Sequence, residues 1–247
     1  MEPGTRTALI TGSGRKSGRA TALTLAASGF NIVVNGSSKT AECEAVAEEI
    51  RAGGGRAAVA MGNVGERDAA MAVAEAGLRE FGTIDVLVNN AAVRPSAGFL
   101  EVSEAEWERV FNIDFKAAFW LSRACLPGMI ERGWGRIINF TGMNAQEGYP
   151  GKPHVTVAKH AALGLTKSLA KEFGPKGVTV NILSPGTIVD EGTDIAADEK
   201  LRQLLATNPA GRLGTPADIA ATIDFLVSDR AGFINGQLLQ INGGVVT

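Results

Sequence analysis

A glycine-rich stretch near the start of the chain has the composition of a phosphate-binding turn. It lies between an apolar run and a segment with helical periodicity, and it reads Thr11-Gly12-Ser13-Gly14-Arg15-Lys16-Ser17-Gly18-Arg19-Ala20. Glycines in such a turn let backbone amides approach a pyrophosphate at the N-terminus of the following helix. Because any tight strand-to-helix turn favours glycine, the motif indicates nucleotide binding only in the setting of a doubly wound domain.

The rest of the chain predicts that setting. Seven short apolar runs are typical of parallel strands buried on both faces: Thr7–Thr11, Asn31–Asn35, Ala57–Met61, Asp85–Asn89, Arg136–Phe140, Val178–Leu183 and Gln237–Ile241. Between them a 3.6-residue periodicity predicts helices over Arg19–Ala27, Thr40–Ala52, Arg67–Phe81, Glu104–Ile130, Thr156–Phe173 and Pro216–Val227. The alternation predicts a single doubly wound α/β domain over residues 1–247. An acidic stretch without a predicted element, about 186–212, is expected to form a flap over a site.

The composition excludes several functions. The 247 residues are 45% hydrophobic and 20% charged, and 24 Lys+Arg against 26 Asp+Glu give a formal charge of −2. This balance lacks the basic excess that nucleic acids or anionic membranes attract, so neither is an expected partner. The chain has two cysteines, Cys43 and Cys125, and two histidines, whose spacing predicts no metal site. A reducing, cytoplasmic location is expected.

Further motifs identify the chain as similar to short-chain dehydrogenases/reductases over essentially its full length. Besides the glycine-rich turn, they are Val88-Asn89-Asn90-Ala91, Gly135–Asn139, Ser184-Pro185-Gly186, Gly211–Pro216, Gly236-Gln237 and Asn242-Gly243-Gly244. The resemblance is to the bacterial 3-ketoacyl-reductase-like branch. It implies a seven-stranded Rossmann sheet in the order 3-2-1-4-5-6-7, an NAD(P) cofactor, hydride transfer at a carbonyl or carbinol, and tetramers.

The positions that carry the family's chemistry are altered. The resemblance places the catalytic tyrosine at Val155, the serine at Gly142 and the helix asparagine at Asp114, whereas the lysine is retained as Lys159. A positioned general acid contributes roughly 10²–10⁴-fold to a rate, and a donor that polarises the carbonyl contributes a similar factor. Valine and glycine can do neither, so the resemblance predicts a degenerate active site.

Nearby side chains offer substitutes for the missing groups. Tyr149 and His154 precede Val155 and could reach the pocket, although a loop aromatic and a helix-entry histidine need no catalytic role. Asp114 could pair with Lys159, either as a structural ion pair or as an acid/base couple.

The resemblance also assigns the cofactor-binding positions. Lys16 replaces the second glycine of the family pattern and is expected either to crowd the pyrophosphate or to bind a phosphate. Arg15 stands where members that use NADP often carry arginine, and Asn35-Gly36-Ser37-Ser38 lacks the acidic residue that selects NAD. NADP is therefore favoured over NAD, and an inherited but empty pocket is the alternative. The full predicted set is Gly12, Arg15, Lys16, Gly18, Asn35, Asn63, Asn90, Lys159, Pro185 and Gly186.

The sequence supports three hypotheses of function. The first is a subunit without hydride transfer of its own that acts as structural or regulatory partner of a competent relative. Its pattern of replaced residues resembles the silent subunits of heteromeric dehydrogenases that act on acyl-CoA substrates. The second is an active enzyme with a rearranged site, either an NADP-dependent carbonyl reductase or alcohol dehydrogenase, or a lyase or dehydratase, using Tyr149, His154, Asp114 or Lys159. The third is a nucleotide-responsive module that binds without turnover.

Association is expected through the helices 104–130 and 156–173, as a homo- or hetero-tetramer. The apolar residues of the first helix exceed what one helix face can bury: Phe111, Phe115, Phe119, Leu121 and Leu126. The ligand is expected to be a small molecule, which the sequence does not identify.

Overall fold

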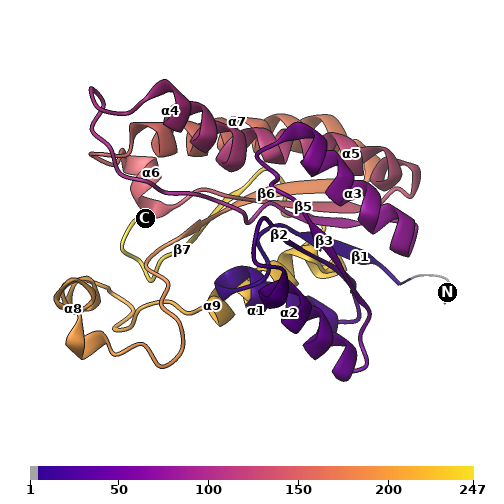
Figure 1. Cartoon of the computed structure of the whole chain (residues 1–247), viewed down its shortest axis with the longest axis horizontal. Helices are drawn as coiled ribbons and strands as arrows, with labels where there is room; N and C mark the ends of the chain where they lie inside the picture. The colour runs from indigo at the N-terminus through magenta and orange to yellow at the C-terminus, as the bar shows by residue number, and fades with distance from the viewer. Residues whose placement is uncertain (1–4) are drawn as a thin grey trace.

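Seven parallel strands form one twisted sheet in the order β3-β2-β1-β4-β5-β6-β7, as the sequence predicts (Figure 1). The structure is a computed structural model, and it describes residues 5–247. The strands are β1 (Thr7–Ile10), β2 (Asn31–Gly36), β3 (Ala57–Met61), β4 (Val86–Val88), β5 (Gly135–Phe140), β6 (Val178–Pro185) and β7 (Leu238–Ile241). The central strands are buried along nearly their whole length, which explains why they read as continuous apolar runs rather than alternating ones.

Helices cover both faces of the sheet (Figure 1). One layer holds α1 (Lys16–Ala27), α2 (Thr40–Ala52) and α9 (Pro216–Val227). The other holds α3 (Arg67–Phe81), α4 (Glu104–Phe111), α5 (Ala117–Glu131) and α7 (Pro153–Phe173). Two apolar clusters fill the space between these layers and the sheet, one on each face. Two short helices, α6 (Met143–Glu147) and α8 (Glu199–Ala206), lie beyond the carboxyl ends of the strands.

The predicted single helix over 104–130 is wrong in one respect. A π turn, Asn112–Lys116, separates α4 from α5. Single π turns of this kind insert an extra residue and are frequent at functional sites. Here the turn carries Asp114, whose side chain is directed inward to a backbone amide and a lysine on α7. The apolar excess on this helix is also smaller than expected, because Leu121 and Leu126 are buried within the chain.

The flap is more ordered than its sequence predicts. Within 186–212 the chain forms a 3-10 turn, Ile195–Ala197, and then α8. Asp194 and Asp198 accept backbone hydrogen bonds that begin these two elements. The acidic residues that were expected to mark an irregular segment are therefore, in part, helix N-caps.

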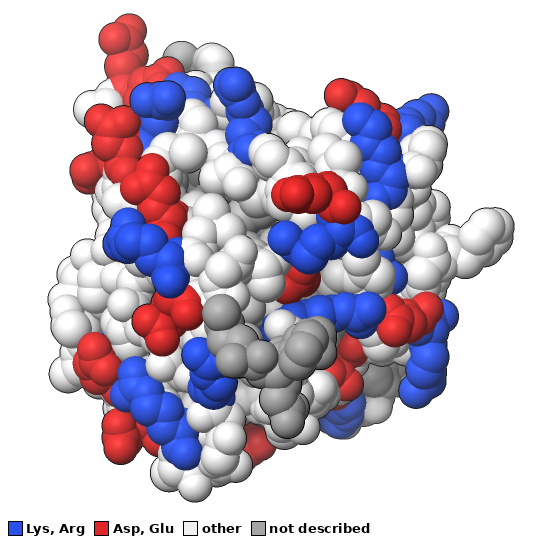
Figure 2. All heavy atoms as spheres, turned by 90° about the vertical axis from the view of Figure 1, so that its right-hand side faces the viewer, with Lys and Arg blue, Asp and Glu red and all other residues white. Residues whose placement is uncertain are grey.

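Charges of both signs lie at the amino ends of the strands. Arg6 pairs with Asp229, and Arg132 pairs with Asp85. Figure 2 shows blue and red side chains interspersed over the face of the molecule at this end. Such mixing on this face fits the low net charge and provides no basic stripe there for a polyanion. Within residues 5–247, no helix is both long enough and apolar enough to cross a lipid bilayer.

Candidate dinucleotide and carbonyl site

A cleft of about 650 Å³ opens at the carboxyl ends of β1 to β4. This is where ligands bind in doubly wound sheets. Its walls include the glycine-rich turn, the end of β2 and the segment Asn90–Arg94 after β4. The predicted cofactor positions that line it are Gly12, Arg15, Lys16, Gly18, Asn35, Asn63 and Asn90. Lys159, Pro185 and Gly186 lie outside this lining.

The turn after β1 folds as it does because of its glycines. Gly12 has φ +62°, in the left-handed region that L side chains avoid. A Cβ at Gly18 would overlap the carbonyl oxygen of Gly12 and lie 2.8 Å from the Cα of Ser13. The first turn of α1 therefore approaches the loop as closely as backbone allows, which is the cradle that a dinucleotide pyrophosphate requires. The residues present fit that group.

Two asparagines that line the cleft also hold the cradle in place. The Asn35 amide donates to the carbonyls of Ala60 and Gly62 at 2.9 and 3.1 Å, and the Gly12 amide donates to Asn35 Oδ1 at 3.3 Å. The Asn90 amide donates to the carbonyls of Thr11 and Gly12 at 2.9 and 3.0 Å. Both side chains thus fix the turn against β3 and β4, which makes them positioning residues.

The charge of the cleft suits phosphate groups. Its basic lining residues are Arg15, Lys16, Lys39 and Arg94, and its one acidic lining residue, Glu42, is 2.7 Å from Lys39 Nζ. Sequence reasoning missed Lys39 and Arg94. Only their positions in the sequence could have indicated them, since each residue follows a strand that ends at the carboxyl edge of the sheet. Asn63, one of the predicted cofactor positions, donates to Glu66 at 2.9 Å and accepts from the Gly65 amide.

Lys16 is the one non-glycine residue in the described part of the chain with positive φ, at 51°. Its ammonium lies 3.8 Å from Asp190 Oδ2 in the flap. Lys16 is therefore a non-glycine residue in a conformation that favours glycine, and its side chain connects the glycine-rich turn to the flap.

A buried ion pair lies behind one wall of the cleft. Asp114 Oδ2 is 3.0 Å from Lys159 Nζ, and both side chains are at most 4% exposed. The other oxygen of Asp114 accepts a 2.8 Å hydrogen bond from the Val93 amide, and Val93 lines the cleft. Burial lowers the pKa of the Lys159 ammonium, and the Asp114 carboxylate opposes this. The structure therefore brings together two of the predicted site residues that are distant in sequence.

The two remaining catalytic positions carry no polar side chain. Val155 is buried in an apolar cluster with Val110 and Ala158. Gly142 has extended backbone (φ −179°), and a Cβ built there would meet no atom within 4 Å. A serine side chain would consequently fit at this position without displacing a neighbour.

The two substitute donors lie in different surroundings. His154 is 1% exposed, with its ring centroid 6.5 Å from that of Trp107, and neither ring nitrogen has a partner within residues 5–247. Tyr149 lies on the surface loop before α7, with the ammonium of Lys152 over its ring at 5.1 Å. His154, in the first turn of α7, is therefore buried against α4, whereas Tyr149 is half-exposed.

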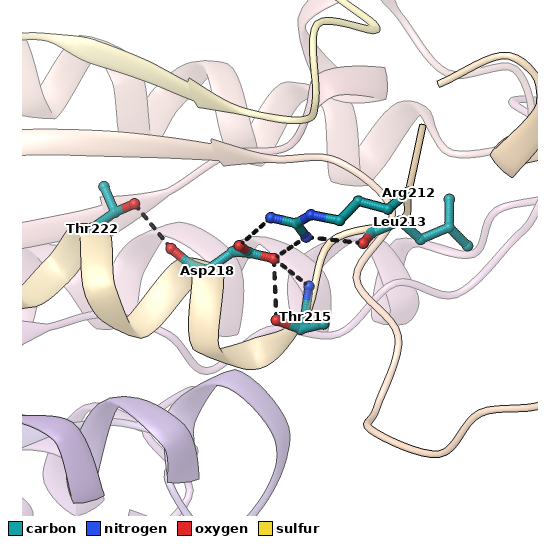
Figure 3. A network of polar contacts seen from close by, with 5 residues as sticks. All are labelled: Arg212, Leu213, Thr215, Asp218 and Thr222. Atoms are coloured by element: carbon teal, nitrogen blue, oxygen red, sulfur yellow. Dashed lines mark hydrogen bonds and ion pairs between the residues drawn. The ribbon is translucent and has the colours of Figure 1, made fainter. Parts of the chain in front are cut away.

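The flap is anchored at both ends. Ile188 forms an isolated parallel bridge with Gly214 at its start. At its end the Arg212 guanidinium binds both carboxylate oxygens of Asp218 at 2.6 and 2.7 Å, and that carboxylate also accepts from the Thr215 amide (Figure 3). The Arg212 hydrogen bonds hold the pKa of Asp218 well below its usual range. The flap therefore begins and ends at fixed points beside β6 and α9.

Comparison with known proteins agrees with this architecture. A family model described as enoyl-(acyl carrier protein) reductase matches residues 15–246. The 3-oxoacyl-[acyl-carrier-protein] reductase FabG of Staphylococcus aureus is 38% identical over 241 residues, which are 98% of each chain. The corresponding reductase of Synechocystis is 37% identical and covers 97% of this chain and 96% of its own.

Solved structures give the same result. A Beutenbergia cavernae structure, described as an NAD(P)-dependent gluconate 5-dehydrogenase with NADP bound at low occupancy, superposes with a TM-score of 0.88 at 37% identity, covering 97% of this chain and 96% of that one. An Agrobacterium tumefaciens structure described as a gluconate dehydrogenase has a TM-score of 0.89 at 31% identity, with 98% and 96% covered. The chain belongs to the short-chain dehydrogenase/reductase family and is similar to its FabG-like 3-oxoacyl reductases.

Proposed function

We propose that the chain is an NADP-dependent oxidoreductase that interconverts a carbonyl and a carbinol on a small substrate of the 3-oxoacyl type. The observation that carries this proposal is the buried pair of Asp114 and Lys159, which holds a transferable proton directly behind the wall of the dinucleotide cleft. The reductases and dehydrogenases that the chain resembles, and its close-fitting glycine cradle, support the proposal.

The preference for NADP rests on the end of β2. The residues there that line the cleft are Gly36, Ser37, Ser38 and Lys39, and Arg15 lies in the same lining. An acidic side chain at this place would bind ribose hydroxyls and repel a 2′-phosphate. Hydroxyls with two cations favour the phosphorylated cofactor instead.

Lys159 is the proton donor in this proposal. When bound, the nicotinamide supplies hydride to the carbonyl carbon. The Lys159 ammonium then gives a proton to the developing alkoxide oxygen and is left as a neutral amine, which solvent reprotonates. Because burial lowers the pKa of Lys159, its ammonium is a stronger acid than an exposed lysine. The Asp114 carboxylate forms an ion pair with the ammonium and orients it until the substrate oxygen takes its place.

A second candidate is the silent subunit of a heteromeric dehydrogenase, acting on an acyl-CoA-type substrate. The valine that packs against Val110 and the missing side chain at Gly142 favour it, because neither provides a donor to a carbonyl oxygen. In this candidate, the surfaces of α4, α5 and α7 bind a competent paralogue, and the chain itself has no hydride-transfer activity.

The deciding experiment replaces Lys159 by arginine. The new side chain would keep a cation beside Asp114, but a guanidinium does not release its proton at neutral pH. We expect the purified wild type to oxidise NADPH with 3-oxoacyl thioesters, and Lys159→Arg to lower kcat roughly 10²-fold or more while NADPH affinity changes little. Lys167→Arg, which changes an exposed lysine on the same helix, is the matched control.

Each alternative predicts a different result. Turnover only after a competent paralogue is added would establish the silent subunit. NADPH binding without turnover in either case would establish the binding module. Loss of substrate without NADPH consumption would indicate a lyase or dehydratase. Wild-type turnover that Lys159→Arg leaves intact would transfer the donor role to Tyr149 or His154, with Tyr149→Phe and His154→Ala as the next variants.

A further inference from the structure

Lys16 has a backbone conformation that its side chain does not favour. Its φ of 51° is in the left-handed region, which is less stable than the right-handed form for an L residue with a Cβ. Glycine would avoid this cost. A lysine held there at the start of α1, in the lining of the cleft, therefore provides a cation at the place where the pyrophosphate approaches the helix.

The cation has a partner in the flap. Asp190 follows Val189, whose amide is bound to the Gly214 carbonyl at 2.9 Å, so the carboxylate projects from an anchored point of the flap. The two charged atoms are 3.8 Å apart, and the side chains are 66% and 55% exposed. This is a loose contact, longer than a hydrogen bond, and such exposed pairs contribute little stability.

Because the contact between Lys16 and Asp190 is loose, the ammonium can exchange the carboxylate for a phosphate oxygen. A diphosphate oxygen can offer Lys16 a charge-assisted hydrogen bond, which is stronger than an exposed ion pair. The carboxylate keeps the flexible lysine side chain beside the cleft, but it also competes with the incoming phosphate for the same ammonium.

We propose that Lys16 is a ligand of the dinucleotide diphosphate and that Asp190 occupies it until the phosphate displaces the carboxylate. Binding then breaks the connection between the glycine-rich turn and the flap. This inference rests on the proposed use of a dinucleotide, but it is independent of turnover.

The test measures NADPH affinity by fluorescence titration in four forms of the full chain: wild type, Lys16→Met, Asp190→Asn and the double variant. Methionine keeps the strained backbone and most of the length of the side chain, so the variant removes chiefly the charge. We expect Lys16→Met to weaken NADPH binding about tenfold and to reduce the dependence of Kd on salt. Asp190→Asn should tighten binding roughly two- to threefold, the size of the competing exposed pair. In the double variant, the effect of Asp190→Asn should vanish.

Two controls separate the pair from general charge effects. Glu191→Gln removes the neighbouring acidic charge of the flap, and Lys200→Met removes a basic charge of α8. Both should leave Kd within about twofold of wild type, because charges outside the pair are screened by solvent and salt. Inorganic pyrophosphate should compete with NADPH in the wild type more effectively than in Lys16→Met.

The outcomes distinguish this inference from the proposed function. Unchanged NADPH affinity in Lys16→Met, or an Asp190→Asn effect that persists in the Lys16→Met background, overturns the inference alone. Normal NADPH binding without turnover overturns the proposed function alone. Absence of NADPH binding in the wild type overturns both.

Discussion

The two parts of the candidate site differ in what builds them. Around the glycine-rich turn, the site consists of backbone held at close approach, and the side chains of Asn35 and Asn90 serve only to fix that backbone. Around α6 and α7, the family's site depends on side chains, and here the scaffold is present while Gly142 and Val155 carry none of the expected polar groups. A backbone site is preserved wherever the fold is preserved, whereas a side-chain site can change one residue at a time.

The largest expected effect is at the one charged pair of the second region. Lys159→Met should lower the free energy of unfolding by about 3–5 kcal/mol, because it leaves the Asp114 carboxylate buried without its partner. Urea denaturation of wild type and variant measures this. The double variant Asp114→Leu with Lys159→Met should recover most of the loss. If Lys159→Met were as stable as wild type, the pair would not be buried as described.

The second prediction compares one glycine from each region. Gly18→Ala should cost about 1–3 kcal/mol of stability through overpacking and should weaken NADPH binding, since the new methyl group would overlap the Gly12 carbonyl. Gly142→Ala should change stability by less than about 0.5 kcal/mol, since its Cβ would meet open space. Thermal unfolding and NADPH titration of both variants test this, and equal losses would contradict the contrast between the regions.

The smallest expected effect is at the clamp that ends the flap. Asp218→Asn should destabilise the chain by at most about 1 kcal/mol, because the Arg212 half of its ion pair is exposed to solvent. The pKa of Asp218 is lowered on folding, so its contribution is present above the unfolded pKa of about 3.9 and is lost as pH falls toward the lowered folded value. The difference in unfolding free energy between wild type and variant should therefore be full near pH ~6 and smaller near pH ~3. A difference that grew on acidification would contradict the assignment, and Glu80→Gln provides a surface-charge control.

Local sequence signals predicted the parts of the fold that local physics determines. The apolar runs of the strands, and the periodicity of α2 and α3, match the observed bounds closely. The π turn was missed because the inward direction of Asp114 depends on Lys159, a residue distant in sequence. The burial of His154 likewise depends on Trp107 in another helix. Lys39 and Arg94 enter the cleft only because parallel strands end at one edge.

The π turn also sets the rotational phase of the long helical segment from α4 to α5. An α-helix advances about 100° per residue, so one inserted residue rotates α4 by that angle relative to α5. Val110 is thereby directed toward α7, and Leu121 is directed into the core between the helices and the sheet. The two side chains thus lie on different faces of the segment. In an uninterrupted α-helix Val110 and Leu121, eleven residues apart, would lie within about 20° of each other on one face, so the π turn is what separates their directions. The register of this helix, rather than any single side chain, thus determines which residues face each other between α4 and α7.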